Sequence, residues 1–482
     1  MTVTTPKYAA GFASQDRTQD EIALTVIGTL PEWLSGTLLR NGPALFQFPN
    51  GSMRHFFDGL ALLHRFDFKG NQVTYSSRFL ESDAYKRARK FGRCSSEEFA
   101  TGPNKSLIER ISGLFSPRLT DNANVNIAPL SGRLAALTET THQLLFDPRT
   151  LAVQGEMKYT DNMRGQLTTA HPHYDFARRE LINVLVNVSK TCHYQIYALK
   201  DGESSRRLVA SLPTKNPAYI HSFAITKRYV ILEEFPLLLE PLSLAFSGKA
   251  YIENYQWHPE RATRFLVIDR DNGALLGTFP FHVAFAFHQI NAFERDDEVV
   301  VDISLYEDSS IIQAFYFSEI EKPNHRFPRA RVERIRINLN KNTISGETLF
   351  KEPFEFARLN YRRNNGNCYR YAYGASQTVQ PDSDRDFLNV LAKLDTETLT
   401  SKTWSSEGCY PGEPVFVARQ SAADEDDGIV MSVILNTISS SSFLLCLDGK
   451  TFQELARAEL PHPLSFGLHG IFIEERNGEH YV

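Results

Sequence analysis

The 482-residue chain has the composition of a globular protein, with 42% hydrophobic and 23% charged residues and a formal net charge of −5 at pH 7. The two charge signs are mixed and no basic run is present, so nucleic acid is not an expected partner. The five cysteines are scattered and never spaced as CxxC, which argues against a disulfide framework or a zinc site. Such cysteines indicate reduced thiols and therefore a cytoplasmic protein.

At the start of the chain, residues 1–20 lack an apolar stretch, so no signal peptide is expected. Helical signal is sparse along the rest of the chain. Segment 106–115 places Leu107, Ile111 and Leu114 on one face at helical spacing. Segment 235–246 is strongly apolar but carries two prolines, which makes it poor strand material. It is expected to form a buried loop or an exposed apolar patch.

A local pattern of apolar strand, tight polar turn and second strand recurs along the sequence. Asp, Asn and Gly tolerate the backbone angles of hairpin turns, so each occurrence predicts a hairpin. The pattern is found seven times, at 66–71, 146–150, 199–202, 268–273, 339–342, 394–398 and 447–451. Repeated β units at this period predict an all-β fold, a seven-bladed β-propeller formed by residues 1–482 as a single domain. A multi-sheet sandwich is the alternative.

Two long uncharged runs, 273–293 and 428–447, have to be weighed as membrane spans. The first contains Pro280, two histidines and Asn291, and the second is split by Asn436 and four serines. Both runs therefore predict strand, turn and strand in place of a transmembrane helix. The 34 Phe and 19 Tyr favour strands, and they also fit an aromatic cavity for a long apolar ligand. Composition alone favours the first interpretation.

Seven ionisable residues lie in similar apolar settings at a spacing close to the hairpin period. They are His171, His221, His288, His469, Glu139, Glu355 and Glu413. If each blade contributes one of them from an inner strand, all converge on the propeller axis. Neutral imidazoles suit iron, zinc, copper or nickel, and a ligating histidine usually donates its other N–H to a carboxylate. Any single one of them is more simply a satisfied polar core residue, but the joint spacing favours a metal centre.

Ordered motifs through most of the chain resemble the carotenoid cleavage oxygenase family. They lie at 39–43, 55–66, 120–126, 168–173, 220–223, 413–416, 426–430, 455–458 and 468–472. The resemblance is closest to the branch of the animal β-carotene oxygenases and the retinoid isomerase of the retinal pigment epithelium. It implies a seven-bladed propeller with one Fe(II) per subunit on its axis and a cap of helices and loops over the active site.

The resemblance assigns the iron ligands to His171, His221, His288 and His469. It also implies that Glu139 orients His221, that Glu355 orients His288, and that Glu413 orients His469. His171 would then have no carboxylate partner. His55 and Asp58 match a family motif but look structural, and His173 is not expected to be a ligand.

The resemblance implies an Fe(II) dioxygenase that uses dioxygen to cleave a C=C bond of a carotenoid or apocarotenoid, with aldehydes such as retinal, or ketones, as products. Cleavage of a stilbene, retinoid isomerohydrolysis and a non-catalytic binding propeller are the alternatives. By position, 106–115 and 235–246 match segments that face the membrane in relatives, so peripheral attachment is expected. The relatives' palmitoylation motif is not evident, because residues 103–105 read Pro-Asn-Lys.

Overall fold

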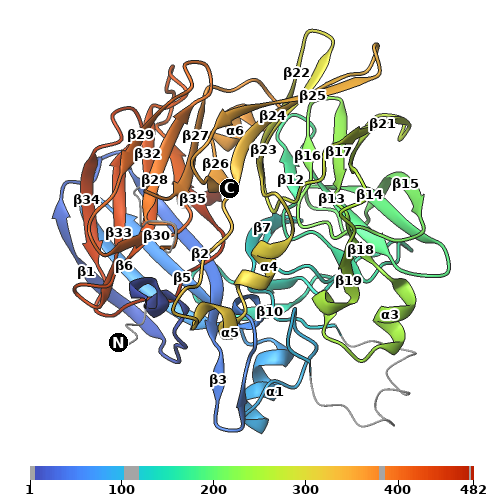
Figure 1. Cartoon of the computed structure of the whole chain (residues 1–482). Coiled ribbons are helices and arrows are strands. Elements are labelled where there is room, and N and C mark those ends of the chain that lie inside the picture. Colours follow the sequence, from blue (N-terminus) through green and yellow to red (C-terminus); the bar gives the residue numbers. More distant parts are fainter. Residues whose placement is uncertain (1–5, 103–118, 379–385, 477–478, 482) are drawn as a thin grey trace.

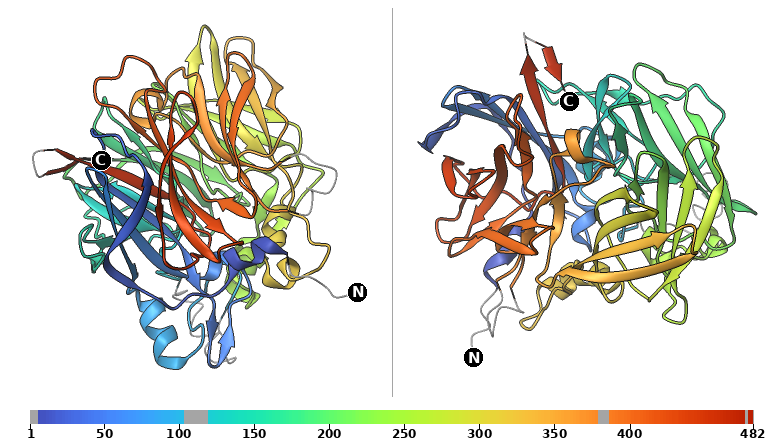
Figure 2. Two further views of the ribbon diagram at one scale, coloured as in Figure 1. Left: turned by 90° about the vertical axis from the view of Figure 1, so that its left-hand side faces the viewer. Right: turned by 90° about the horizontal axis from the view of Figure 1, so that it is seen from above.

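The computed structural model describes residues 6–102, 119–378, 386–476 and 479–481 of the chain. These residues form an all-β, propeller-like fold in which sheets are arranged around a central axis, with few and short helices (Figures 1 and 2). The apolar faces of neighbouring sheets pack against each other and form the core between them.

Five separate sheets of four or five antiparallel strands follow one another along the chain. The first contains β7 (Asn126–Leu130), β8 (Arg133–Leu137), β9 (Leu144–Phe146) and β10 (Val153–Glu156). The second contains β11 (Leu167–Thr168), β12 (His173–Asp175), β13 (Glu180–Asn187), β14 (Cys192–Lys200) and β15 (Arg207–Thr214). The third contains β16 (Ala224–Ile225), β17 (Tyr229–Glu234), β20 (Thr263–Asp269) and β21 (Leu275–Phe281). The fourth contains β22 (Gln289–Arg295), β23 (Glu298–Leu305), β24 (Arg331–Asn338) and β25 (Thr343–Phe350). The fifth contains β26 (Glu355–Arg358), β27 (Tyr371–Ser376), β28 (Val390–Asp395) and β29 (Thr400–Trp404).

The remaining large sheet has 11 strands and joins the two ends of the chain. Its N-terminal strands are β1 (Gln19–Gly28), β2 (Ser35–Leu45), β5 (Leu60–Lys69) and β6 (Gln72–Phe79). Its C-terminal strands are β30 (Cys409–Pro411), β31 (Val415–Ala418), β32 (Gly428–Asn436), β33 (Ser441–Asp448), β34 (Glu454–Glu459), β35 (Gly470–Arg476) and β36 (Glu479–Tyr481). Because β2 pairs with β35 and β1 with β34, strands from the two ends of the chain close the ring.

The prediction of seven blades is wrong, since the described residues form five separate sheets of four or five strands, while the other strands of the ring join in one 11-stranded sheet. The physical reason lies in β1, which pairs with two different strands. Its first part, including Ile22 to Leu24, pairs with β6, and its second part, Thr25 to Gly28, pairs with β34. Within the pairing with β6, the register also shifts between Gln19 and Ile22, ahead of the change of partner. One continuous strand thereby joins two sets of strands that would otherwise form two separate sheets.

The helices are short and lie outside the sheets. They are η1 (Lys7–Phe12), η2 (Phe56–Asp58), α1 (Asp83–Phe91), α3 (Pro241–Phe246), η3 (Tyr251–Asn254), α4 (Ser310–Ala314), α5 (Phe317–Ile320) and α6 (Tyr361–Asn364). α1 begins after Ser82, whose hydroxyl accepts from Tyr85 N at 3.0 Å, and ends at Gly92 with φ 62°. Two small hairpins pair β3 (Gln47–Phe48) with β4 (Gly51–Ser52), and β18 (Leu237–Leu239) with β19 (Tyr255–Trp257).

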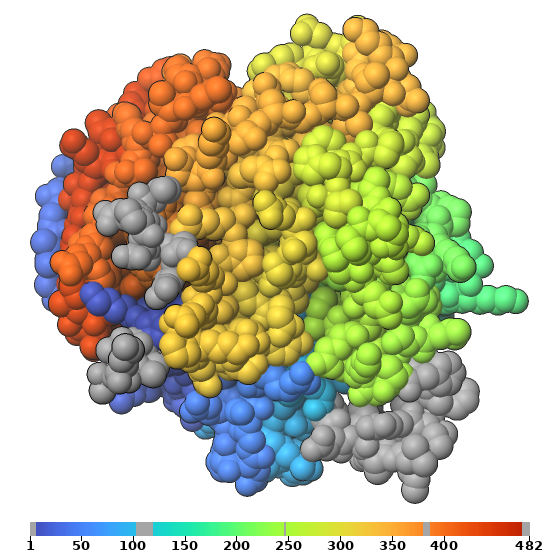
Figure 3. All heavy atoms as spheres, viewed as in Figure 1, coloured from blue at the N-terminus to red at the C-terminus, as the bar shows by residue number. Residues whose placement is uncertain are grey.

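The segment with α4 and α5 packs on the N-terminal part of the chain and covers one end of the propeller. A bridge joins His55 to Tyr316, and Phe56 N donates to Phe315 O at 3.0 Å. Figure 3 shows this segment in yellow above the blue residues around β3 and α1. Short helices and loops thus lie against this end of the molecule, where the sequence predicted a cap.

All seven predicted hairpins are confirmed by strand pairing on both sides of each turn. The uncharged runs 273–293 and 428–447 contain β21 with β22 and β32 with β33, as predicted. Segment 235–246 was expected to be poor strand material, but it holds strand β18. Pro236 and Pro241 flank this strand, so they remove no ladder hydrogen bond within it. Segment 106–115 lies outside the described residues. Among the described residues, no helix is long and apolar enough to cross a membrane.

Candidate metal centre

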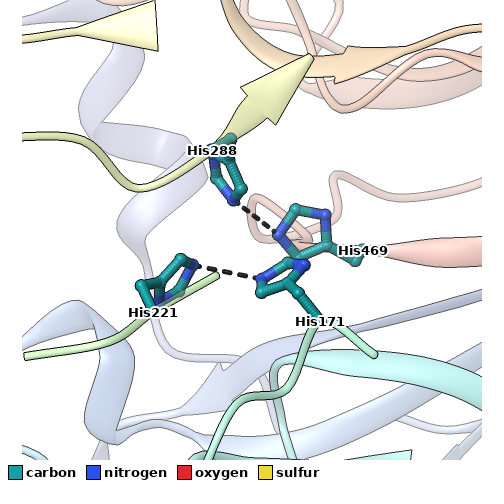
Figure 4. Close-up of side chains that lie close together, drawn as sticks. All are labelled: His171, His221, His288 and His469. Carbon is teal, nitrogen blue, oxygen red and sulfur yellow. Dashed lines mark hydrogen bonds between the residues drawn. The ribbon is translucent and has the colours of Figure 1, made fainter. Parts of the chain in front are cut away.

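The four histidines lie at the inner ends of their sheets, where the chain runs between strands near the axis. His171 lies between β11 and β12, whereas His221, His288 and His469 precede β16, β22 and β35. One ring nitrogen from each comes within 4.8 Å of those from the other three (Figure 4). Residues separated by almost 300 positions in the sequence therefore share one small volume.

Three of these rings are oriented by carboxylates on their Nδ1 side. His221 Nδ1 lies 2.6 Å from Glu139 Oε1, His288 Nδ1 lies 2.7 Å from Glu355 Oε2, and His469 Nδ1 lies 2.7 Å from Glu413 Oε1. Because an ionised carboxylate only accepts, Nδ1 carries the proton in each pair. Nε2 of these rings then presents a lone pair.

The Nε2 lone pairs point toward one another. Nε2 of His288 and Nε2 of His469 are 3.2 Å apart, and Nε2 of His171 and Nε2 of His221 are 3.1 Å apart (Figure 4). Two acceptors at this distance repel each other unless a proton or a cation lies between them. The convergence of neutral donors is thus an arrangement that fits a metal ion.

Burial favours the neutral form of three of the imidazoles. It lowers the pKa of His171 well below the ordinary value, and the three neighbouring rings lower it further. Burial also lowers the pKa of His469 to about 3, against the opposing effect of Glu413. For His221 the pKa is likewise lowered by burial, although Glu139 opposes the shift. Neutral imidazole is the form that binds metals.

The carboxylates have unequal surroundings. Glu139 Oε1 also accepts from Tyr219 OH at 2.6 Å. Glu413 forms ion pairs with the buried Arg40 and, at 2.9 Å, with Arg358 Nε. Burial alone would raise the pKa of Glu413, but Arg358 and Arg40 lower it below its ordinary value. Of the three carboxylates, Glu413 is therefore the one held anionic by two guanidinium groups.

His171 differs from the other three histidines. Its backbone N donates to Thr169 Oγ1 at 3.2 Å, and no carboxylate in the described part of the chain lies within ion-pair distance of its ring. His173 points elsewhere, because its Nε2 bonds Phe223 O at 2.8 Å and its Nδ1 lies 3.2 Å from Tyr361 OH. It takes no part in the cluster.

His55 and Asp58 belong to the scaffold, as expected. His55 Nδ1 accepts from Phe57 N at 3.0 Å, and Asp58 Oδ2 accepts from His55 N at 3.1 Å, which closes a capping box around η2. On the other side of the ring, His55 Nε2 bonds Ile312 O at 2.9 Å. The pair thus fixes η2 against α4 away from the four histidines.

A largely aromatic cavity opens beside the four histidines and includes His221, His288 and His469 in its wall. Its other walls come from η2, from the α4 region and from loops. The aromatic lining is Phe56, Phe57, Phe99, Tyr219, Tyr251, Phe287, Tyr306, Phe315, Phe327, Phe356, Phe387 and Phe466. The excess of Phe and Tyr in the sequence hinted at such a cavity, but it could not show which rings meet there.

Sequence reasoning missed Arg40 and Arg358 altogether. Arg40 lies in the 39–43 motif, and Arg358 follows Glu355 by three positions on β26, so both could have been noted as cations near predicted site segments. Nothing in their local sequence indicates that both reach Glu413, because that contact joins distant parts of the chain.

The chain resembles characterised proteins over nearly its whole length. The family model described as "Retinal pigment epithelial membrane protein" matches residues 11–474. The mitochondrial carotenoid-cleaving dioxygenase of Mustela putorius furo is 32% identical over an alignment that covers 97% of this chain and 96% of that protein. The beta,beta-carotene 15,15'-dioxygenase of Rattus norvegicus is 32% identical, with 95% and 90% covered. Among solved structures, cobalt-substituted apocarotenoid oxygenase from Synechocystis superposes with a TM-score of 0.84 at 25% identity, with 97% and 98% covered.

Proposed function

Because the chain belongs to the carotenoid cleavage oxygenase family, we propose that it is an Fe(II)-dependent dioxygenase that cleaves a C=C bond of a carotenoid or apocarotenoid to give aldehyde or ketone products. The observation that carries the proposal is the convergence of four neutral imidazole donors beside a large aromatic cavity. Relatives that cover almost the whole chain are named as carotenoid-cleaving dioxygenases, which supports the same substrate class.

His171, His221, His288 and His469 would hold one iron per subunit. Imidazole suits iron, and an octahedral ion held by four protein ligands keeps positions open for small molecules. Iron, when bound, supplies the activation of dioxygen. All four ligands are neutral, so the full charge of the cation is left to polarise what binds in those positions. Glu139, Glu355 and Glu413 would fix the ring orientations through Nδ1.

The cavity would position the substrate and exclude water. Its phenylalanine rings offer an extended apolar surface on which a conjugated chain packs, and buried aromatic groups contribute strongly to such contacts. A dry site also limits side reactions of activated oxygen. The protein's own contribution is therefore to hold one double bond of a polyene beside the four histidines.

The test combines iron content with oxygen uptake and product identification. Purified protein loaded with Fe(II) should consume dioxygen with a panel of carotenoids and apocarotenals and form two carbonyl products. A stilbene and a retinyl ester belong in the same panel, because they represent the alternative chemistries on this scaffold. Cleavage of the stilbene alone, or isomerisation of the ester without oxygen uptake, would replace the proposed reaction.

We also propose peripheral contact with membranes through 106–115 and 235–246. Within the second segment, Phe235 and β18 are buried, but Leu242 on α3 is 74% exposed. An exposed leucine on a short helix that begins with proline fits shallow insertion into a lipid surface. The cytoplasmic location, the single-domain organisation and retinal as a product stay predictions of the sequence.

A further inference from the structure

One buried hydroxyl group contacts the chain on both sides of His288. Ser222 Oγ lies within hydrogen-bond distance of Phe287 O and 2.5 Å from Gln289 Oε1. Phe287 and Gln289 are the two sequence neighbours of His288, and Ser222 itself directly follows His221. The hydroxyl has one proton, so it donates to one of the two acceptors at a time. It therefore links the segments that carry two of the four histidines.

A buried carboxyl group contacts the amide of Gln289. Gln289 Nε2 donates to Glu233 Oε2 at 3.0 Å, and Glu233, on β17, is 1% exposed. Among the described residues, no cationic side chain lies within ion-pair distance of Glu233, and burial raises the pKa of its carboxyl well above the ordinary value. Because the amide nitrogen faces Glu233, the amide oxygen faces Ser222. The three side chains form one continuous chain of hydrogen bonds.

Regular strand pairing cannot set the distance between these two histidines. His221 lies outside a strand ahead of β16, and His288 lies outside a strand ahead of β22. β16 and β22 belong to different sheets, so no ladder of backbone hydrogen bonds joins them. The side-chain link from Ser222 to Phe287 and Gln289 crosses from one sheet to the other where the ladders are absent.

We propose that Ser222, supported by Gln289 and Glu233, is a positioning group that sets the spacing of His221 and His288 in the metal centre. The inference rests on the proposed metal-binding function, but it concerns residues that touch neither metal nor substrate. Its physical basis is preorganisation: ligands held at the right separation before the cation arrives bind it more tightly than ligands that must be drawn together.

The test uses the full-length protein, freed of metal and titrated with Co²⁺, whose absorption spectrum reports the ligand geometry. Cobalt is a suitable probe because a structural relative of this chain has been solved in cobalt-substituted form. Wild type should bind one Co²⁺ per chain. Ser222→Ala should bind it about 10–100-fold more weakly, the usual effect of losing an outer partner of a metal site, and with a shifted spectrum.

Three further variants separate positioning from general packing. Ser222→Thr keeps the hydroxyl and should restore the affinity and the spectrum. Gln289→Met removes the amide at nearly constant side-chain length, so it should show the same weaker Co²⁺ binding and shifted spectrum as Ser222→Ala. It replaces Ser222→Ala in the test if that variant does not fold. Ser345→Ala, at an exposed position on β25, is the matched control and should bind like wild type. Thermal unfolding of each metal-free variant monitors the fold.

Two results would overturn the inference while leaving the metal centre in place. One is wild-type affinity and spectrum in both Ser222→Ala and Gln289→Met. The other is a Ser222→Thr variant as weak as Ser222→Ala although the metal-free protein is folded. Failure of the wild type to bind Co²⁺ would overturn the metal centre itself, and with it this inference.

Discussion

Replacing Glu98 with glutamine should remove a large pH-dependent loss of stability. Glu98 is 2% exposed and lies in the wall of the aromatic cavity. Its carboxyl accepts from Thr120 Oγ1 at 2.9 Å and from Asn122 Nδ2 at 3.3 Å, and no cationic side chain of the described chain forms an ion pair with it. Burial, together with the nearby carboxylate of Asp58, raises the pKa of Glu98 from 4.5 to about 8.

The magnitude can be worked out from that shift. In the unfolded chain the carboxyl ionises near its ordinary pKa, whereas the folded protein keeps the proton until about pH 8. Folding therefore takes up a proton between these two values, and the free energy of unfolding falls as the pH rises through this window. The stabilisation is complete below pH 4.5 and lost above about pH 8. At about 1.4 kcal/mol per unit, the full loss is on the order of 5 kcal/mol.

Glu98→Gln cannot ionise, so it should lack this loss. Urea titrations at a series of pH values give the free energy of unfolding of both proteins. As the pH rises, the variant should become more stable relative to wild type by several kcal/mol. At low pH the variant should be slightly less stable, since an amide nitrogen cannot accept from Asn122. Glu407→Gln, at an exposed position on the outer surface, is the control.

The reasoning would be refuted if the difference in unfolding free energy between Glu98→Gln and wild type stayed constant with pH. Glu98 would then be ionised in the folded and in the unfolded protein alike. Infrared spectroscopy gives an independent reading. The protonated carboxyl absorption of the wild type at neutral pH should lose one component in Glu98→Gln, while the component from other buried acids such as Glu233 remains. The same band unchanged in both proteins would assign it to another group.

Three further predictions concern the metal centre and the surface. Glu413→Gln should weaken Fe(II) binding about 10–100-fold, as loss of a carboxylate behind a ligating histidine usually does, and a metal titration of the variant checks it. Removal of iron with a chelator should abolish oxygen uptake, which Fe(II) but not Zn(II) should restore. Leu242→Ser should reduce flotation with liposomes relative to wild type. Ile438→Ser, at another exposed apolar position, is the control and should float like wild type. If both variants float as well as wild type, docking through α3 is contradicted.

The hairpins could be predicted because their determinants are local. The turns Asp147 to Thr150 and Asp448 to Thr451 show the reason, since in each the aspartate Oδ1 accepts from backbone N–H groups two and three positions later. Residues within the turn thus decide its shape. The number of separate sheets could not be predicted in this way. It depends on a change in the pairing of β1 after Leu24, from β6 to β34. β1 and β34 are more than 400 residues apart in the sequence.

The residues of the candidate site likewise fall into those that the sequence pattern reveals and those that only the packing of the fold brings together. The histidines and glutamates could be proposed because equivalent places in successive sheets supply them at regular intervals, so their spacing is visible in the sequence. Ser222 carries no such signal, since its partners are 65 and 67 positions away and only the packing of two sheets brings them together. Arg40 is a stronger case, because it meets Glu413 across 373 positions through closure of the ring.

This closure has a consequence for the charge around the centre. Arg40 comes from the N-terminal strand β2 and Arg358 from β26, and both reach the carboxylate behind His469. A carboxylate that shares its charge with two guanidinium groups attracts the proton on Nδ1 of its histidine less strongly than one without them. Of the three rings that face a carboxylate, His469 is therefore the least polarised toward imidazolate, and Glu139, which has a tyrosine hydroxyl as its further partner, leaves His221 more electron-rich. The four imidazoles would thus present unequal donors to a cation, and the inequality would arise from where the ring of sheets closes.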